Sequence, residues 1–460
     1  MTALMDYYNF VMTHAPYFYW LPGSGQHDPA WGRGAFVAAF AIDFLYECYG
    51  DPRFESEKTN IYNKIVELAD FILTQQCTDP LKDAYGGFKS AEASDSYYAI
   101  DGCRVIPGLL HAYELTNTSG YLDAAKLAGG TFLKTMQDKQ TYGGFARAVD
   151  INDAWLLQMD IECLYGLIGL KMLCSYDPDN QSQYELMMST LVDFLREGFE
   201  AYWLYYDPAD DEWHRVGLTE NEIYDDPFSY ALLGLYDYEG RSLTVDKVYE
   251  FINTISASAD YPGYNSCICW SGYIDVETRK AACDYYDGVT SGILWAIRSA
   301  FDKPSLALSD QIIEDDSDNF MYWGVKFIDF SPEANSQSTV TVSWLGHLFL
   351  KYQPPLTRFT QLLNKYGENL DVLMIVEAGE PVSYFDPISI RGLVRSIRAD
   401  EILIEPGYMI TDFLTIYTFL PVRHHDKIRR HGTDYEVAEL QVVRFKREPM
   451  YFRSVCRRLL

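Results

Sequence analysis

The stretch Tyr85-Gly86-Gly87-Phe88 recurs later in the chain as Tyr142-Gly143-Gly144-Phe145. Each copy follows a pair of predicted helices, and each leads into the next pair. A helical hairpin that repeats about every 50 residues is typical of a stacked or closed helical array. The repeat therefore predicts that successive helical hairpins pack side by side.

Hydrophobic periodicity supports these hairpins. Apolar side chains lie on one face of a predicted helix at Ile61, Ile65, Leu68 and Ile72. Gly50 marks the end of the preceding predicted helix. The same reasoning predicts helices near 31–49, 57–76, 98–116, 120–137, 152–175, 181–201, 226–237, 244–258, 286–302 and 338–352.

The chain changes character at Pro354-Pro355. Before this pair, residues 1–353 contain 22 Lys and Arg against 52 Asp and Glu, a formal net charge of −30. After it, residues 354–460 contain 15 against 14, a net charge of +1. The hydrophobic pattern changes at the same place, from helical periodicity to short alternating runs. We therefore expect two domains, 1–353 and 354–460, rather than one domain with an uneven surface.

Composition narrows the classes of protein that fit. The 460 residues carry a net charge of −29, and 48% are hydrophobic, which is typical of a globular protein. The negative charge disfavours binding of nucleic acid or anionic membranes by the first domain. No apolar run reaches the roughly 20 residues of a membrane span, and the first residues lack a signal-peptide pattern. We therefore expect no membrane insertion.

Neither a cofactor nor a metal is expected. Nine cysteines are scattered through the chain, which favours reduced core thiols in a protein made in the cytoplasm. Cys267, Cys269 and Cys283 lie close together in the sequence, but no fourth ligand stands at zinc-like spacing. The histidines of the first domain are isolated and form no metal signature.

Roughly five to six hairpins in about 350 residues fit a closed ring of paired helices. The hairpin period and the Tyr-Gly-Gly-Phe loops resemble the α/α-barrel glycoside hydrolases, epimerases and related sugar-active enzymes. This resemblance implies that the first domain is an all-α (α/α)6 toroid. An open helical solenoid is the alternative. Terpene-cyclase-like toroids share such loops, but their Asp-rich catalytic box is not found.

Several acidic residues stand where a loop is predicted to turn into a helix. If these helices form the inner ring, their N-terminal ends meet at one rim and surround a single cleft. A glycoside hydrolase needs one carboxylic acid to protonate the leaving oxygen and a second carboxylate as base or nucleophile. The candidate catalytic residues are Asp101, Asp153, Asp225, Asp226 and Asp287.

Aromatic residues in the same rim segments could stack on sugar rings. The candidate substrate-binding residues are Trp31, Trp155, Trp270 and Tyr286. The alternative role for the carboxylates is helix capping, because Asp at a helix start accepts hydrogen bonds from free N–H groups. Asp225-Asp226-Pro227 fits an N-cap followed by Pro in the first turn. A sugar-binding cleft without turnover also fits this pattern.

The second domain is predicted to be a small antiparallel β-barrel or sandwich. Pro354-Pro355 stops the last helix, and a short helix over 356–366 is expected to follow. Alternating apolar residues and turn signals such as His431-Gly432 define the strands. These strands are predicted over 372–377, 390–398, 413–420, 435–445 and 451–456.

A series of short motifs follows in order through the second domain. They are Lys365-Tyr366-Gly367-Glu368, Ser383-Tyr384-Phe385-Asp386-Pro387, Arg391-Gly392-Leu393-Val394, His425-Asp426-Lys427-Ile428 and Gly432-Thr433-Asp434-Tyr435-Glu436-Val437. This order resembles the head-closure (stopper, or head–tail joining) proteins of tailed bacteriophages and related archaeal viruses. The resemblance implies an Asp-Lys-Ile turn leading to a hairpin, and a barrel that packs in a ring with copies of itself. The acidic toroid in front is not part of that family's usual pattern.

The end of the second domain is basic, since residues 423–460 contain ten basic and five acidic side chains. In a ring these cations could contact the phosphate backbone of packaged DNA, or pair with carboxylates of neighbouring subunits. A carbohydrate-binding module behind a glycosidase is the alternative for this domain. Such a module would be expected to carry a planar row of exposed aromatic residues.

These expectations lead to a structural virion protein of a tailed virus. It would be a head–tail connector of the neck, assembled in the host cytoplasm, in contact with portal or adaptor and tail proteins. The toroid would project outward and bind or hydrolyse a host surface glycan. The first alternative is a cytoplasmic α/α-barrel glycoside hydrolase with an appended β module. The second is a ring-forming connector whose toroid is an inactive enzyme.

Overall fold

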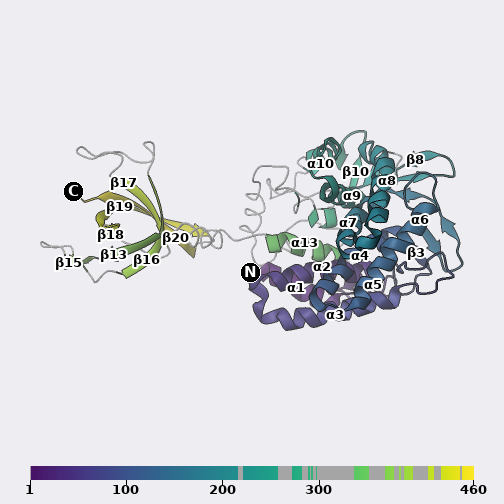
Figure 1. Cartoon of the computed structure of the whole chain (residues 1–460). Coiled ribbons are helices and arrows are strands. Elements are labelled where there is room, and N and C mark those ends of the chain that lie inside the picture. Colours follow the sequence, from purple (N-terminus) through teal and green to yellow (C-terminus); the bar gives the residue numbers. More distant parts are fainter. Residues whose placement is uncertain are drawn as a thin grey trace. The chain divides into compact units, whose positions relative to one another are not determined.

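The computed structural model describes residues 2–215, 221–256, 272–281, 288–290, 292–293, 297, 336–351, 368–373, 375–377, 383–384, 388–396, 413–418, 426–445 and 448–459. The chain divides into two compact units, Met1–Tyr352 and Gln353–Leu460, which Figure 1 shows coloured along the sequence. The division adjoins the Pro354-Pro355 pair, where the charge and the hydrophobic pattern change.

An inner layer of apolar helices forms the centre of the helical unit. Its described members are α2 (Ala35–Gly50), α4 (Ala99–Thr116), α7 (Gly166–Tyr176), α9 (Asp225–Glu239) and α13 (Thr339–Lys351). α13 packs against α2, α2 against α4, α4 against α7, and α7 against α9. Every residue from Ala35 to Ile42 is buried, as expected for a helix with protein on all sides.

An outer layer of amphipathic helices covers the inner one (Figure 1). It contains α1 (Thr2–His14), α3 (Lys58–Gln75), α5 (Ser119–Leu127), α6 (Lys134–Asp138), α8 (Gln181–Glu200) and α10 (Leu243–Ser256). α1 packs on α13, α3 on α2, α5 on α4, α8 on α7, and α10 on α9. Ile61, Ile65 and Leu68 are fully buried, so the predicted apolar face of this helix is confirmed. The expected hairpins are therefore inner–outer helix pairs.

Glycines bring neighbouring inner segments into close contact. A Cβ atom at Gly108 of α4 would lie 2.8 Å from Cα of Ala39 in α2. A Cβ atom at Gly234 of α9 would lie 2.1 Å from the carbonyl oxygen of Leu164. Both distances are shorter than a carbon atom can adopt without a backbone shift, so these positions require glycine.

Short strands gather where the inner helices begin. β3 (Ser96–Tyr98) leads directly into α4, β9 (Glu222–Tyr224) into α9, and β12 (Gln337–Ser338) into α13. β6 (Met159–Asp160) leads through the 3-10 turn η3 (Ile161–Tyr165) into α7. These strands belong to three-stranded antiparallel sheets with the orders β12-β1-β2, β3-β4-β5, β6-β7-β8 and β11-β10-β9.

The remaining strands of these sheets have the following bounds: β1 (Tyr19–Leu21), β2 (Gln26–His27), β4 (Ala148–Asp150), β5 (Trp155–Leu156), β7 (Tyr205–Asp207), β8 (Glu212–His214), β10 (Tyr273–Asp275) and β11 (Lys280–Ala281). The N-terminal ends of the inner helices are thus surrounded by small sheets.

Three helix predictions need correction or completion. The helix expected over 152–175 begins only at Ile161, because 155–156 form β5 and 159–160 form β6. α1 was not predicted, and α5 continues into α6 through a π-helical turn, η2 (Ala128–Leu133). Of the helix expected over 286–302, residues 288–290, 292–293 and 297 are described and helical. The short helix expected over 356–366 lies outside the described residues.

The C-terminal unit is a curled antiparallel sheet that closes on itself. Its strands are β13 (Glu368–Leu373), β16 (Ile388–Ser396), β17 (Phe413–Thr418), β20 (Glu448–Arg458), β19 (Thr433–Phe445) and β18 (Lys427–Arg430). They pair in that order, and β18 pairs back to β13. A separate hairpin joins β14 (Ile375–Glu377) and β15 (Ser383–Tyr384).

The core of this sheet is small, and one part of its predicted pattern is wrong. Leu370, Ile416, Ile428 and Val437 are among the residues that pack inside it. Ile428 had been predicted to lie in an Asp-Lys-Ile turn, but it lies in β18 and pairs with Tyr435 of β19. The turn comes three residues later, at His431-Gly432, where both residues have positive φ angles of 46° and 80°. Gly432 therefore has the predicted role.

Candidate functional site

A cleft of about 800 Å³ lies in the helical unit where inner helices begin. Residues of β1, β3, β9, β10 and β12 contribute to its wall, together with the first turns of α4 and α9. The described wall carries two acidic residues and one basic residue: Asp101, Asp226 and Arg104. Its size is typical of a small-molecule site.

Asp101 lies in the first turn of α4, directly after β3. It is only 2% exposed, although it contributes to the cleft wall. Its Oδ1 atom lies 3.6 Å from Nη1 of Arg104, whereas its buried Oδ2 atom has no hydrogen-bond partner among the described residues. Burial raises the pKa of this carboxyl, while the charge of Arg104 and a hydrogen bond from the side chain of Ser90 oppose that rise. Asp101 is therefore a buried acid that retains a proton more readily than an exposed Asp.

Arg104 connects Asp101 to the next inner segment. Its Nη2 atom donates to Oε1 of Glu162, in the first turn of η3. The guanidinium also packs over the rings of Tyr230 and Phe36, with its Cζ atom 4.9 and 5.3 Å from their centroids. Only 13% of the Arg104 side chain and 15% of the Glu162 side chain are exposed. These contacts hold the guanidinium in one orientation beside the cleft.

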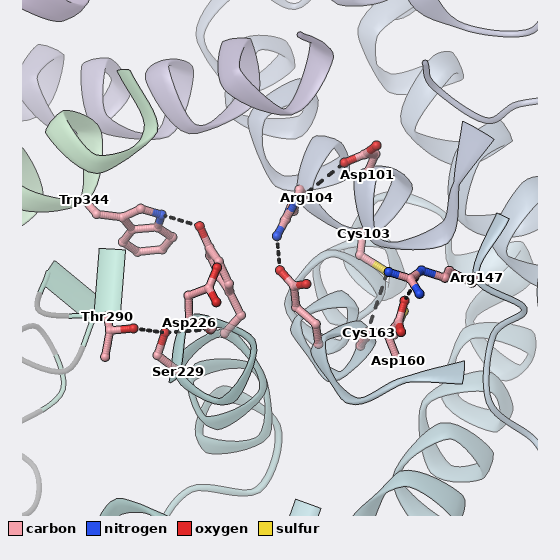
Figure 2. Close-up of polar contacts among 12 residues, drawn as sticks. Asp101, Cys103, Arg104, Arg147, Asp160, Cys163, Asp226, Ser229, Thr290 and Trp344 are labelled. Carbon is pink, nitrogen blue, oxygen red and sulfur yellow. Dashed lines mark hydrogen bonds and ion pairs between the residues drawn. The ribbon is translucent and has the colours of Figure 1, made fainter. Parts of the chain in front are cut away.

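Asp226 contributes the second carboxylate of the cleft, from the first turn of α9. It is half-buried, and its backbone carbonyl accepts a hydrogen bond of 2.8 Å from Oγ of Ser229. Thr290 donates in turn to Ser229 over 3.4 Å. Figure 2 shows Asp226 and Asp101 on opposite sides of Arg104 in that view.

Tyr230, one turn beyond Asp226, also contributes to the cleft wall. Its hydroxyl accepts a hydrogen bond of 3.1 Å from Nε1 of Trp344, and its ring stacks on Phe40 at 5.7 Å. Burial raises the pKa of the Tyr230 hydroxyl well above its usual range. This residue is therefore a neutral, fixed aromatic wall.

Aromatic side chains form much of the remaining wall. They are Phe18, Tyr19, Trp31, Phe36, Tyr98, Tyr224, Tyr230 and Tyr273. Trp31 is 52% exposed and stacks on Phe18 with a centroid distance of 5.3 Å. One face of the Trp31 ring is thus supported by protein while half of the residue remains accessible. Flat rings of this kind can stack on sugar rings.

A second carboxylate–arginine pair lies next to the cleft wall without being part of it. Asp160 lies immediately before η3, and its Oδ2 atom is 3.3 Å from Nε of Arg147. Burial raises the pKa of Asp160, while Arg147 opposes the rise. Asp160 is not among the described cleft residues.

Asp153 and Trp155 do not contribute to the described cleft wall. Asp153 was predicted to begin a helix, but it lies in the turn between β4 and β5 with a positive φ of 62°. Its carboxylate pairs with Nζ of Lys82 at 3.2 Å. Trp155 donates through Nε1 to Asp83 over 2.9 Å, and Lys139 lies over its ring at 4.4 Å. Local pairing therefore accounts for both residues.

The other candidates are only partly described. Asp225 is the first residue of α9, and Trp270, Tyr286 and Asp287 lie outside the described residues. Of the nine candidates, Asp101, Asp226 and Trp31 contribute to the described cleft wall.

Sequence reasoning missed Arg104 and Glu162. Arg104 follows Asp101 at the i, i+3 spacing that brings two helical side chains together, so its pairing could have been inferred from the sequence. Glu162 is 58 residues from Arg104, and no local pattern connects them.

No group of three or more His, Cys, Asp or Glu side chains in the described part of the chain is arranged to hold a metal ion. No helix within it combines the length and apolar character needed to cross a membrane.

The fold of the helical unit is similar to those of sugar-active enzymes. Cellobiose 2-epimerase from Spirochaeta thermophila aligns with a TM-score of 0.55 and 12% identity, over 76% of this chain and 94% of that chain. An unsaturated glucuronyl hydrolase specific for heparin aligns with a TM-score of 0.52 and 12% identity, over 76% and 94%. An alpha-amylase from Clostridium perfringens aligns with a TM-score of 0.51 and 11% identity, over 76% and 98%.

These likenesses establish that the helical unit has an (α/α)6 glycoside hydrolase-like toroid fold. At such low identity they establish the fold alone. No protein-family model matches the sequence, and no curated protein matches it either. None of these findings bears on a head-closure function of the C-terminal unit, which stays a prediction.

Proposed function

We propose that the helical unit binds a glycan in its cleft and hydrolyses a glycosidic bond there. One observation carries this proposal. Asp101 is a buried carboxyl with a raised pKa, and the same cleft wall contains the more exposed carboxylate of Asp226. Two carboxyl groups in different environments are the pair that glycoside hydrolysis needs.

The proposed roles follow from those environments. Asp101 is the general acid: it donates its proton to the glycosidic oxygen as the bond between that oxygen and the anomeric carbon breaks. Asp226 is the base that takes a proton from the attacking water, or the nucleophile that bonds to the anomeric carbon before water releases the sugar. Trp31 and the neighbouring rings hold the sugar faces.

Turnover and binding should separate in carboxamide variants. Asp101→Asn and Asp226→Asn in the full chain should each lower kcat on a hydrolysed oligosaccharide by about 10²- to 10⁴-fold. Binding measured by calorimetry should persist, because the cleft shape is unchanged. Asp153→Asn is the matched control, because this carboxylate does not contribute to the cleft. Full turnover in both cleft variants would overturn the assignment, and so would equal losses in the control.

The C-terminal unit supports a second, separate proposal, that of a ring-forming neck component of a tailed virion. The observation in its favour is the hairpin of β18 and β19, whose turn at His431-Gly432 leads to a buried Val437 in the predicted order. Portal, adaptor and tail proteins would be its neighbours, and its basic end would face carboxylates or packaged DNA. Electron microscopy of the full chain tests it. Rings support this proposal, and monodisperse single chains would contradict it.

A further inference from the structure

Two buried polar atoms on the cleft wall lack hydrogen-bond partners among the described residues: Oδ2 of Asp101 and Nε of Arg104. They belong to residues one helical turn apart on α4, and both residues contribute to the cleft wall. Buried polar groups are rarely left unpaired, because the lost contact with water is costly. Two such atoms on neighbouring cleft residues indicate a place where a ligand completes the bonding.

Contacts elsewhere on the guanidinium fix its orientation. Nη1 lies 3.6 Å from Oδ1 of Asp101, Nη2 donates to Glu162, and Cζ lies over the rings of Tyr230 and Phe36. Rotation of the group would break these contacts. Nε is therefore a donor of Arg104 that lacks a partner among the described residues, and its orientation is fixed by the contacts of the rest of the group.

We propose that Asp101 and Arg104 together recognise the uncharged oxygens of one sugar, so that the cleft selects neutral glycans over glycans of uronic acids or amino sugars. Nε of Arg104 donates to a hydroxyl oxygen of the sugar whose glycosidic oxygen meets Oδ2 of Asp101. This inference rests on the proposed function and specifies its substrate class. Arg104 is then a specificity-determining residue.

A sugar carboxylate fits this place poorly. Arg104 is the only basic residue on the described cleft wall, and Asp101, Glu162 and Asp226 lie on or beside it. Residues 1–353 as a whole carry a net charge of −30. A uronate would meet one cation that is already paired with Glu162, together with the carboxylate of Asp226 on the same wall, an arrangement that disfavours an anion.

A protonated sugar amine also fits poorly at this place. An ammonium group has no lone pair, so it cannot accept the hydrogen bond of Nε, and it would lie beside the guanidinium charge. A hydroxyl accepts from Nε without bringing a charge. An amino sugar is therefore disfavoured because it leaves Nε of Arg104 without a hydrogen-bond acceptor.

The direct test uses the full-length chain and matched 1,4-linked oligosaccharides of glucose, glucosamine and glucuronic acid. Binding is measured by calorimetry on Asp226→Asn, in which we expect turnover to be strongly slowed. We expect the glucosamine and glucuronic acid ligands to bind at least about tenfold more weakly than the glucose ligand. Equal or tighter binding of either charged ligand, with the glucose ligand still bound, overturns the inference and leaves the proposed function standing. If none of the three binds, the proposed function fails and this inference fails with it.

A variant pair tests the residue itself. Arg104→Lys in the same background keeps a positive charge but removes the Nε–H group, and should weaken glucose-oligosaccharide binding about tenfold. Arg196→Lys is the control. Arg196 lies on the outer helix α8 and makes an ion pair with Glu239, the last residue of α9, and neither residue contributes to the described cleft wall. Unchanged affinity in Arg104→Lys, or the same loss in the control, overturns the assignment to Arg104. If the lysine variant does not fold, the comparison of the three oligosaccharides with Arg104 in place still tests the inference.

Discussion

Nη1 of Arg104 lies 3.6 Å from Oδ1 of Asp101, one turn earlier on the same helix. The other end of the guanidinium binds Glu162, so one cation joins α4 to η3. This arrangement fixes Asp101 with Oδ1 toward the arginine and leaves Oδ2 without a partner among the described residues. Burial raises the pKa of Asp101 despite the cation, which suits an acid rather than a permanent anion.

The alkaline limb of the pH–activity profile should respond to Arg104. The arginine lowers the pKa of Asp101 against the effect of burial, so Arg104→Gln should raise that pKa further. If Asp101 must be protonated to act, the fall of kcat/KM at high pH should then move to higher pH. Arg147→Gln is the control, because Arg147 pairs with Asp160 instead. A shift to lower pH, or none, would contradict the assignment of Asp101 as the acid.

Loss of Arg104 should also destabilise the fold by leaving Glu162 unpaired. Arg104→Gln should lower the free energy of unfolding by about 3–5 kcal/mol, the usual cost of breaking a buried pair. The double variant Arg104→Gln, Glu162→Gln should recover part of this loss, because it contains no unpaired carboxylate. Urea unfolding of both variants measures the coupling. Additive losses would show that the two residues do not form an energetic pair.

A methyl group added at Gly234 should destabilise the contact between neighbouring inner segments. Gly234→Ala places a methyl carbon against the carbonyl oxygen of Leu164, and we expect a loss of about 1–3 kcal/mol or more. Gly50→Ala is the control, because nothing lies within 4 Å of its added carbon. That variant should be neutral or slightly stabilising. A neutral result at Gly234 would contradict the close packing of α9 against η3.

Stability of the fold should decrease in mild acid because the half-buried His14 resists protonation. Burial, with a contribution from His27, lowers the pKa of His14 to about 4, and Nδ1 of His14 lies 3.1 Å from Nε2 of His27. The unfolded chain therefore binds more protons than the folded chain between pH 6.5 and about 4, and the stabilising contribution is lost as the pH falls through that window.

Replacing His14 should remove that part of the pH dependence. The slope of unfolding free energy against pH should be smaller in His14→Phe than in the unaltered chain. His214→Gln is the control, since His214 lies outside this cluster and pairs with Asp210. An identical slope in His14→Phe would show that folding does not lower the pKa of this histidine.

The repeat and the apolar periodicity were sufficient to predict the paired helices. α2 and α4 are recognisable because an inner helix is apolar on all sides, and α3 because an outer helix is apolar on one side only. The loop-to-helix pattern correctly put Asp101 in the first turn of an inner helix.

The same pattern failed at Asp153. A short acidic loop before Trp155 looks like a helix start, but the side chain of Asp150 accepts hydrogen bonds from the N–H groups of Asn152 and Ala154 and closes a turn between two strands. The bridge from Arg104 to Glu162 could not be predicted either, because only the tertiary packing of neighbouring inner helices brings α4 and η3 together. Local sequence signals do not contain such tertiary contacts.

The most direct test of a glycan-hydrolysing cleft is a crystal structure of the full-length Asp226→Asn variant with an oligosaccharide that the unaltered chain hydrolyses. We expect the glycosidic oxygen within hydrogen-bond distance of Oδ2 of Asp101, a neighbouring hydroxyl on Nε of Arg104, and a sugar ring against Trp31. A glycan bound away from Asp101, or a hydrolysed glycan that never occupies the cleft, would contradict the central claim.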